Sequence, residues 1–258
     1  MSRQVLVVSG LGKSFGALQA ISDLHFHVED GEIVGLIGPN GAGKTTAINL
    51  ISGRLKPDTG MVRLEDKVVT GFSTNSLVQR GLVRTFQSTA VYPERSVWSN
   101  VLRGAFAEIY KGFWPALVNT GAQKRRRDAA IVHVETILDE LGLQDVRDVP
   151  AQQLPYGRQK TLGLAIAIAS RPRVILLDEP AAGLSAEEVD RVADVIRRIN
   201  SRGVSVVVVD HNMRFISGLC RRVVVLHHGR ELCTGKPAEI AANPQVIEAY
   251  LGTVNEPA

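Results

Sequence analysis

A glycine-rich stretch at residues 38–45 limits the possible folds of this chain more than any other part of its sequence. The stretch reads Gly-Pro-Asn-Gly-Ala-Gly-Lys-Thr and matches the pattern G-x-x-x-x-G-K-S/T. A short apolar run, residues 33–37, precedes it, and a segment of helical character, residues 44–52, begins inside it. A continuous apolar run of this length suits a strand that is buried on both faces of a sheet. We therefore expect a strand, a tight loop and a helix in succession.

This arrangement is a phosphate-binding loop. Glycines allow backbone N–H groups to point at phosphate oxygens, and the helix N-terminus adds the positive end of its dipole. We expect Lys44 to neutralise the β- and γ-phosphates of ATP, Thr45 to ligate Mg²⁺, and Thr46 to contact the α-phosphate. An accidental glycine-rich turn would need neither the preceding strand nor the following helix. The expected nucleotide-binding residues of the loop are Gly38, Pro39, Asn40, Gly41, Ala42, Gly43, Lys44, Thr45 and Thr46.

Two adjacent acids follow a second apolar run, at residues 174–177. A buried strand delivers such residues to its C-terminal edge, where ligands of open α/β sheets bind. Asp178 is placed to hold Mg²⁺ through water, and Glu179 to polarise the attacking water as general base. Taken alone, an acidic pair after a strand is more often an ordinary strand-to-loop boundary. Its combination with the phosphate-binding loop favours ATP hydrolysis.

Composition narrows the class of protein. The chain has 258 residues, of which 45% are hydrophobic and 22% are charged, as is usual for a globular domain. Its longest apolar runs, residues 163–169 and 204–209, are far shorter than the roughly 20 residues of a membrane-spanning helix. We expect no signal peptide, a reducing cytosol for the two cysteines, and a membrane role only through partners. A net charge of +4 makes the protein mildly basic, which could suit a membrane surface or nucleic acid; we expect no nucleic-acid partner.

Strands and helices alternate along most of the chain, which predicts an α/β fold with a largely parallel sheet. Strands are expected at residues 5–8, 24–28, 33–37, 61–64, 67–69, 81–86, 174–177, 205–209, 223–226 and 230–234, and helices at residues 44–52, 97–110, 122–141, 159–170, 187–200, 237–241 and 244–251. We interpret residues 1–258 as one domain. Residues 1–87 and 154–235 would form the nucleotide-binding core with a β subdomain, 88–153 a helical insertion, and 236–258 a C-terminal helical tail.

The order of these motifs resembles the ATPases of ABC transporters. Between the phosphate-binding loop and Asp178-Glu179 lies Leu154-Pro155-Tyr156-Gly157-Arg158-Gln159, where that family has its signature motif. The resemblance covers essentially the whole chain. It implies a P-loop NTPase (RecA-like) core with an antiparallel β subdomain and an inserted helical subdomain. It also implies that Leu154, Pro155, Tyr156, Gly157 and Arg158 contact the nucleotide held by a second ATPase subunit.

The same resemblance gives roles to three residues outside these motifs. Gln87 is similar to the family's Q-loop glutamine, which touches Mg²⁺ or water and moves the helical region. His211 is similar to the switch histidine that contacts the γ-phosphate, although a lone histidine at a strand end usually caps or packs. Phe15 is similar to the aromatic residue that stacks on adenine.

Further motifs resemble the LivG-type ATPases within this family. They are Arg84-Thr85-Phe86-Gln87, the Tyr-Gly of the signature, Pro180-Ala181-Ala182-Gly183-Leu184, and the ending from Asn243-Pro244 to Gly252. The resemblance implies an importer of branched-chain amino acids, or of related amino acids, amides or urea. It implies a LivF-like second ATPase (or a second copy of this chain), two permease subunits and a periplasmic binding protein. The chain would then lie on the cytoplasmic side of the inner membrane.

Two positions depart from the family pattern. Pro155 stands where the signature has serine, and it lacks both the hydroxyl and the N–H that could reach a γ-phosphate. Ser185 stands where the loop after Glu179 usually has aspartate. The charge of Arg158 could offset the loss at Pro155. These departures suggest that the chain works best opposite a different ATPase, with two unequal sites.

Three other classes remain as alternatives. One is an exporter ATPase, such as the cassette for lipopolysaccharide extraction. Another is a soluble ABC ATPase that acts on DNA or ribosomes, although such chains usually carry tandem cassettes or a long coiled coil. The third is a P-loop nucleotide kinase, for which no lid or acceptor site is evident and which would leave the signature and His211 unexplained.

Overall fold

A four-stranded antiparallel sheet forms the N-terminal part of the computed structural model, which describes residues 3–85, 92–105 and 121–251. Its strands are β1 (Gln4–Phe15), β2 (Leu18–Glu29), β4 (Thr59–Leu64) and β5 (Lys67–Val68), in the order β2-β1-β4-β5. The first two strands form a long hairpin that ends at Phe15 and Leu18.

A six-stranded mixed sheet carries the loops that hold most of the expected site residues. It consists of β3 (Ile33–Ile37), β6 (Leu82–Arg84), β7 (Val174–Asp178), β8 (Ser205–Val209), β9 (Arg222–His227) and β10 (Arg230–Gly235), in the order β10-β9-β3-β8-β7-β6. All neighbours are parallel except β9 and β10. Every residue of β3, β7 and β8 is buried, as expected for strands covered on both faces. The carboxyl ends of these three strands therefore meet at one edge of the sheet.

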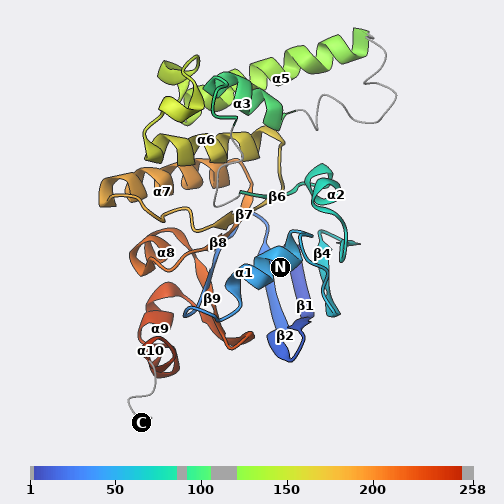
Figure 1. Ribbon diagram of the computed structural model, residues 1–258, viewed down its shortest axis with the longest axis vertical. Helices are drawn as coiled ribbons and strands as arrows, with labels where there is room; N and C mark the ends of the chain where they lie inside the picture. The colour runs from blue at the N-terminus through green and yellow to red at the C-terminus, as the bar shows by residue number, and fades with distance from the viewer. Residues whose placement is uncertain (1–2, 86–91, 106–120, 252–258) are drawn as a thin grey trace.

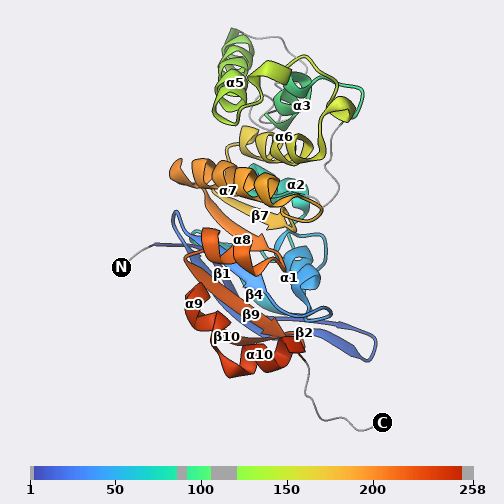
Figure 2. The same cartoon turned by 90° about the vertical axis from the view of Figure 1, so that its left-hand side faces the viewer.

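Helices cover the sheets and also form the two ends of an elongated molecule. They are α1 (Lys44–Ile51), α2 (Thr74–Gln79), α3 (Val97–Gly104), α5 (Gly121–Glu140), η2 (Gln144–Val146), η3 (Ala151–Gln153), α6 (Tyr156–Ala169), α7 (Ala186–Ser201), α8 (Met213–Leu219), α9 (Pro237–Ala241) and α10 (Pro244–Leu251). Figure 1 and Figure 2 show α3, α5 and α6 stacked beyond α7 at one end, and α9 and α10 at the other. None of the described helices is long and apolar enough to span a bilayer.

The core has two parts. One lies between the six-stranded sheet and the helices α3, α5, α6, α7 and α8, and the other joins the two sheets around α1. Helix α7 shows how sequence pattern gives this packing: its buried residues are Val189, Val192, Ala193, Val195, Ile196 and Ile199, which share one helical face. Apolar burial of this kind is the main favourable term in folding.

Most expected elements are confirmed, but some differ in extent and two α-helices were not foreseen. The helix expected at residues 97–110 is α3, which ends at Gly104, and residues 106–110 lie outside the described part of the chain. β1 and β2 extend well beyond residues 5–8 and 24–28 because they pair with each other through several register shifts. Helix α6 begins at Tyr156 rather than at 159, since the fixed φ of Pro155 suits the position before a helix. Helices α2 and α8 were not expected. At the start of α2 the Ser73 hydroxyl accepts a hydrogen bond from the Ser76 N–H, and at the start of α8 the Asn212 side chain accepts one from the Phe215 N–H. The limits drawn at residues 87/88 and 153/154 between the subdomains stay predictions.

Candidate nucleotide-binding site

The loop between β3 and α1 can only be built from glycine at two positions. Gly38 has a φ of 153°, and a Cβ there would lie 2.2 Å from the Leu226 carbonyl oxygen. Gly43 has a φ of 100°, and its Cβ would lie 2.7 Å from the Ala20 carbonyl oxygen. Left-handed backbone and close approach both exclude other residues here. The glycines of the motif therefore shape the loop as well as leaving room for phosphate.

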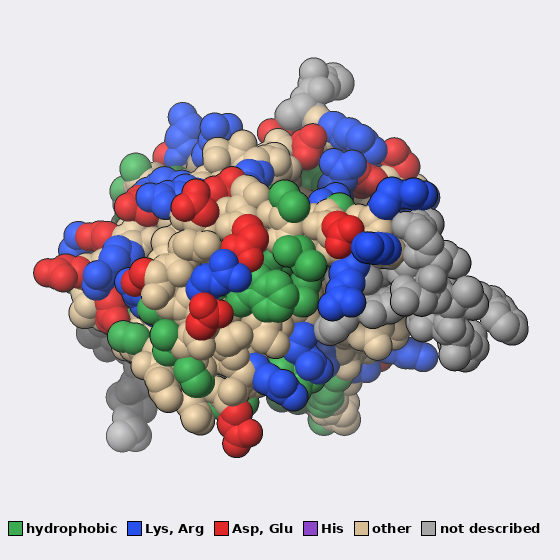
Figure 3. Space-filling model, turned by 90° about the horizontal axis from the view of Figure 1, so that it is seen from above, with side chains coloured by type: hydrophobic (Ala, Val, Ile, Leu, Met, Phe, Trp, Pro, Cys, Tyr) green, Lys and Arg blue, Asp and Glu red, His purple; other side chains and the backbone are tan. Residues whose placement is uncertain are grey.

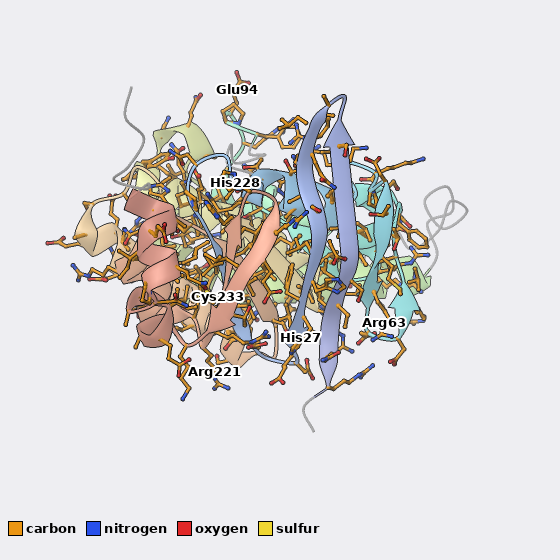
Figure 4. The ribbon with its side chains drawn as sticks, turned by 90° about the horizontal axis from the view of Figure 1, so that it is seen from below. His27, Arg63, Glu94, Arg221, His228 and Cys233 are labelled. Atoms are coloured by element: carbon orange, nitrogen blue, oxygen red, sulfur yellow. The ribbon has the colours of Figure 1, made fainter. Side chains whose placement is uncertain are left out.

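Backbone hydrogen bonds connect this loop to the β9–β10 turn, and that turn to strand β2 of the other sheet. The Gly229 N–H donates to the Ala42 carbonyl oxygen over 3.0 Å, and the Ser22 N–H donates to the Gly229 carbonyl oxygen over 2.8 Å. Gly229 belongs to the turn between β9 and β10, next to His228 (Figure 4). Seen from below, β10 lies between the C-terminal helices and the β1–β2 hairpin (Figure 4). The phosphate-binding loop is thus held at the junction of the two sheets.

Lys44 is the first residue of α1 and bends back over the loop. Its Nζ donates to the carbonyl oxygens of Gly38 and Pro39 at 2.7 and 2.8 Å. Burial lowers the pKa of Lys44, and the nearby negative charge of Glu179 opposes this effect. Thr45 is exposed and Thr46 half-buried in the first turn of the same helix. The ammonium, this turn and the carboxylate of Glu179 therefore share one site.

Asp178 is the last residue of β7, and its carboxylate forms a buried ion pair that the sequence motifs did not indicate. Its Oδ2 accepts a hydrogen bond of 2.7 Å from Nη2 of Arg84, the last residue of β6. The side chains of the two residues are only 7% and 4% exposed. Nη1 of Arg84 also donates to Asn49 Oδ1 at 2.6 Å and lies 3.3 Å from Ser52 Oγ. The carboxylate expected to hold Mg²⁺ is therefore linked through arginine to α1.

Glu179 lies immediately after β7, in an unusual backbone conformation. Its φ is +48°, and its N–H donates to the Val209 carbonyl oxygen of the adjacent strand over 2.8 Å. The buried carboxylate of Asp210 accepts hydrogen bonds from the N–H groups of Ala181 at 3.0 Å and Asn212 at 2.9 Å. Asp210 thus fixes the loop after Glu179 and the loop that carries His211 at the same time.

The remaining expected site residues lie around this centre. The His211 side chain is 63% exposed, and its Nδ1 lies 3.9 Å from Asp210 Oδ1. Phe15 is exposed at the end of β1, with Lys13 Nζ 5.7 Å from the centre of its ring. Gln87 lies outside the described residues.

The signature residues form the start of α6. Pro155 precedes the helix, Tyr156 is exposed, and Leu154 is buried. A Cβ on Gly157 would lie 2.7 Å from Glu188 Oε1, so the first turns of α6 and α7 are in close contact. Nη1 of Arg158 donates to Asp145 Oδ2 over 2.7 Å. A contact of Arg158 with another subunit's nucleotide would therefore require it to leave this pair.

The donor atoms of this centre suit a hard divalent cation. The Thr45 hydroxyl and the Asp178 carboxylate offer oxygen, the element that Mg²⁺ prefers. Among the described residues, no group of three or more His, Cys, Asp or Glu side chains could hold a metal by itself. A cation bound mainly by phosphate oxygens, with one or two protein oxygens, fits this arrangement.

Fold and site together define a P-loop ATPase of α/β architecture. The ABC transporter family model matches residues 21–182, and a model described as "Branched-chain amino acid ATP-binding cassette transporter" matches residues 230–254. The chain belongs to the ABC transporter family, as one of its ATP-binding, ATP-hydrolysing subunits. The expected ABC ATPase fold and the resemblance to LivG-type ATPases are confirmed.

Curated relatives match the chain over nearly its full length. It is 36% identical to the high-affinity branched-chain amino acid transport ATP-binding protein BraF of Pseudomonas aeruginosa, over 98% of this chain and 99% of that protein. It is 35% identical to LivG of Escherichia coli, which carries the same description, over the same shares. It is 34% identical to the lipopolysaccharide export system ATP-binding protein LptB of Acidithiobacillus ferridurans, over 96% and 97%.

Solved structures show the same fold. The ADP conformation of MJ1267, an ATP-binding cassette of an ABC transporter, superposes with a TM-score of 0.85 at 26% identity, over 97% of this chain and 100% of that chain. A nucleotide-free cassette superposes with a TM-score of 0.83, over 96% and 99%.

Arg84 and Asp210 are the residues of this centre to which motif reasoning gave no role. A signal for both was present in the sequence, since Arg84 is a charged residue at the end of a buried strand and Asp210 directly follows one. Such a residue needs a buried partner. The identity of the partner, however, follows only from which strands become neighbours.

Proposed function

We propose that this chain is the ATPase subunit of an importer for branched-chain amino acids, or for related amino acids, amides or urea. The match of residues 230–254 to the branched-chain amino acid cassette model carries the choice of solute class. That segment lies beyond residues 21–182, to which the general ABC transporter model matches. The near full-length similarity to BraF and LivG supports the same choice.

Nucleotide binding is assigned to the phosphate-binding loop. Residues 38–46 would surround the phosphates, with Lys44 exchanging its two loop carbonyls for phosphate oxygens. Phe15 would stack on adenine. Mg²⁺, when bound with the nucleotide, would be held by Thr45, by Asp178 through water and by Gln87, and would neutralise charge on the phosphates.

Hydrolysis is assigned to Glu179. Its carboxylate would take a proton from water as the water oxygen attacks the γ-phosphorus and the bond to the β–γ bridging oxygen breaks, giving ADP and phosphate. The proximity of Glu179 to Lys44 supports its placement at the γ-phosphate end of the site. His211 would contact the γ-phosphate from the adjacent loop, which Asp210 holds beside Glu179.

Coupling to transport is assigned to a pair of cassettes. ATP would bridge the loop of one subunit and the signature residues Leu154 to Arg158 of the other, so that binding favours the closed pair. We propose a LivF-like ATPase as the second cassette because Pro155 offers no N–H to a phosphate. Two permease subunits would complete the complex on the cytoplasmic side of the inner membrane, with a periplasmic binding protein delivering solute.

The helical end is the proposed permease contact. Figure 3 looks onto this end and shows acidic and basic side chains interspersed around a patch of hydrophobic ones. Tyr92 and Val132 are large hydrophobic residues exposed in this part of the chain, at 50% and 66%. A mixed surface of this kind suits a partner protein better than a nucleic acid, whose phosphates would favour a uniformly basic face.

The partners can be identified directly. Tagged chain with Glu179→Gln, held in its ATP-bound form with Mg²⁺, should co-purify from native membranes with a second cassette and two amino-acid permeases. Wild-type chain with ADP is the matched control and should recover less of the second cassette. Recovery of lipopolysaccharide-export components, or of ribosomes or DNA in place of permeases, would overturn the importer assignment.

A further inference from the structure

Arg84 is a buried cation at the end of a short buried strand. All three residues of β6 are buried, and the Arg84 side chain is 4% exposed. Moving a charge out of water costs several kcal/mol unless partners are fixed around it. The planar guanidinium of arginine carries five N–H donors in a rigid arrangement and can hold several partners in one geometry.

The partners of Arg84 come from two different elements of the nucleotide site. One edge of its guanidinium holds Asp178 Oδ2 at 2.7 Å. The other nitrogen donates to Asn49 Oδ1 at 2.6 Å and lies 3.3 Å from Ser52 Oγ, near the C-terminal end of α1. Helix α1 begins at Lys44, so Arg84 connects the helix of the phosphate-binding loop to the carboxylate at the end of β7.

This connection leaves one oxygen of Asp178 available. In the described part of the chain, the protein hydrogen bond to the carboxylate goes to Oδ2, and none goes to Oδ1. An acceptor that is held through one oxygen presents the other in a fixed direction. Cation sites need such fixed orientation, because Mg²⁺ tolerates little departure from octahedral geometry.

We propose that Arg84 is a positioning residue for the Mg²⁺–nucleotide site: by bridging Asp178 and Asn49, it sets the Asp178 carboxylate at a fixed place relative to Lys44 and Thr45. The proposal rests on the proposed role of Asp178 in holding Mg²⁺ through water. In this role Arg84 is not a ligand of the nucleotide or the cation; it orients Asp178, which would hold Mg²⁺ through water.

A double-mutant cycle on Mg²⁺-dependent nucleotide binding tests this role without relying on hydrolysis. The affinity for ADP is measured by calorimetry in EDTA and in Mg²⁺, and the ratio of the two dissociation constants is the Mg²⁺ gain. The proteins are the wild-type chain, Arg84→Gln, Asp178→Asn and the double variant. Arg173→Gln is the matched control, since this arginine precedes β7 and its side chain is 66% exposed.

We expect Arg84→Gln to bind ADP in EDTA within about twofold of wild type and to lose about tenfold of the Mg²⁺ gain, on the order of what removal of a partner behind a metal ligand costs. The double variant should show the same gain as Asp178→Asn alone. Arg173→Gln should behave as wild type. An unchanged gain in Arg84→Gln, or a further loss when it is added to Asp178→Asn, would overturn the proposal.

Two further results keep the test decisive. If the unpaired Asp178 carboxylate prevents Arg84→Gln from folding, Arg84→Lys takes its place, because lysine keeps the charge but loses the planar fork. It should lose about threefold of the gain, and an unchanged gain would overturn the proposal. Equal gains in wild type and Asp178→Asn would instead remove the role of Asp178 in holding Mg²⁺, and this inference with it.

Discussion

At the residue scale, Glu179 is held in a conformation that few non-glycine residues adopt. Its φ of +48° is stabilised by the hydrogen bond to Val209 and by Asp210, which binds the next turn of the loop. Backbone strain of this kind costs about 1–3 kcal/mol and persists where the surroundings fix it. The strand end and the neighbouring loop therefore place this carboxylate, and its own conformational preference does not.

Glu179→Gln removes the proposed base and keeps its shape. We expect the rate of phosphate release to fall at least about 100-fold, which is the lower range for general-base catalysis, while ATP affinity stays within about twofold. Phosphate release and calorimetric binding measure the two quantities. Glu187→Gln, a neutralised acid in the exposed first turn of α7, is the control. Unchanged turnover in Glu179→Gln would refute the assignment.

The affinity for nucleotide should fall at alkaline pH, because binding depends on the charged ammonium of Lys44. Phosphate favours the ammonium form, so affinity is complete below the pKa of free Lys44 and is lost as the pH rises through it. Because burial lowers this pKa, the loss should begin at a lower pH than for an ordinary lysine. ADP affinity measured from about pH 8 to pH 10 tests this expectation. Lys44→Arg should bind with no such decline, and an equal decline in both would contradict it.

The ion pair of Arg84 and Asp178 shows why part of the site could not be predicted. The loop glycines, Lys44 and Asp178-Glu179 are local motifs whose chemistry is fixed by spacing. Arg84 and Asp178 lie 94 residues apart in sequence. They meet only because β6 pairs with β7, with Arg84 in register with Leu176. No periodicity along the chain encodes that pairing.

At the element scale, Ser185 has a clear local role. Its hydroxyl accepts a hydrogen bond from the Glu188 N–H, and the Glu188 carboxylate accepts one from the Ser185 N–H, which together form a capping box at the start of α7. Ser185 stands where the family usually has aspartate, and serine caps a helix as well as aspartate does. Glu188 also lies against Gly157, so this cap adjoins the signature residues.

Removal of this cap should weaken the whole chain modestly. We expect Ser185→Ala to lower the free energy of unfolding by about 1 kcal/mol, and Ser185→Asp to leave it nearly unchanged, since aspartate caps as well as serine does. Urea unfolding of the three proteins measures both values. A loss in Ser185→Asp as large as in Ser185→Ala would show that capping is not what this position contributes.

Elements differed in how well the sequence predicted them. The continuous apolar runs of β3, β7 and β8 were recognisable because burial on both faces leaves no polar positions. The full length of the β1–β2 hairpin was not recognisable, because its outer half contains polar residues such as Lys13 and the exposed Ser14. That half is defined by pairing across a bulged register rather than by an alternating pattern.

At the scale of the whole molecule, Pro155 and the asymmetry it implies lead to a prediction about partners. The chain alone should hydrolyse ATP slowly, and addition of its genomic partner cassette should raise the rate at least about tenfold, because the partner's signature would supply the N–H that Pro155 lacks to the nucleotide held by Lys44. ATPase assays of the chain alone, the partner alone and the mixture measure this. Full activity of the chain by itself would contradict two unequal sites.

Uptake of labelled leucine, isoleucine and valine tests the importer assignment most directly. Cells that lack this gene receive either the wild-type chain or Glu179→Gln at equal expression. We predict that the deletion reduces uptake, that the wild-type chain restores it, and that Glu179→Gln does not, because import would require hydrolysis at this site. Normal uptake in the deleted cells, or full restoration by Glu179→Gln, would contradict the account.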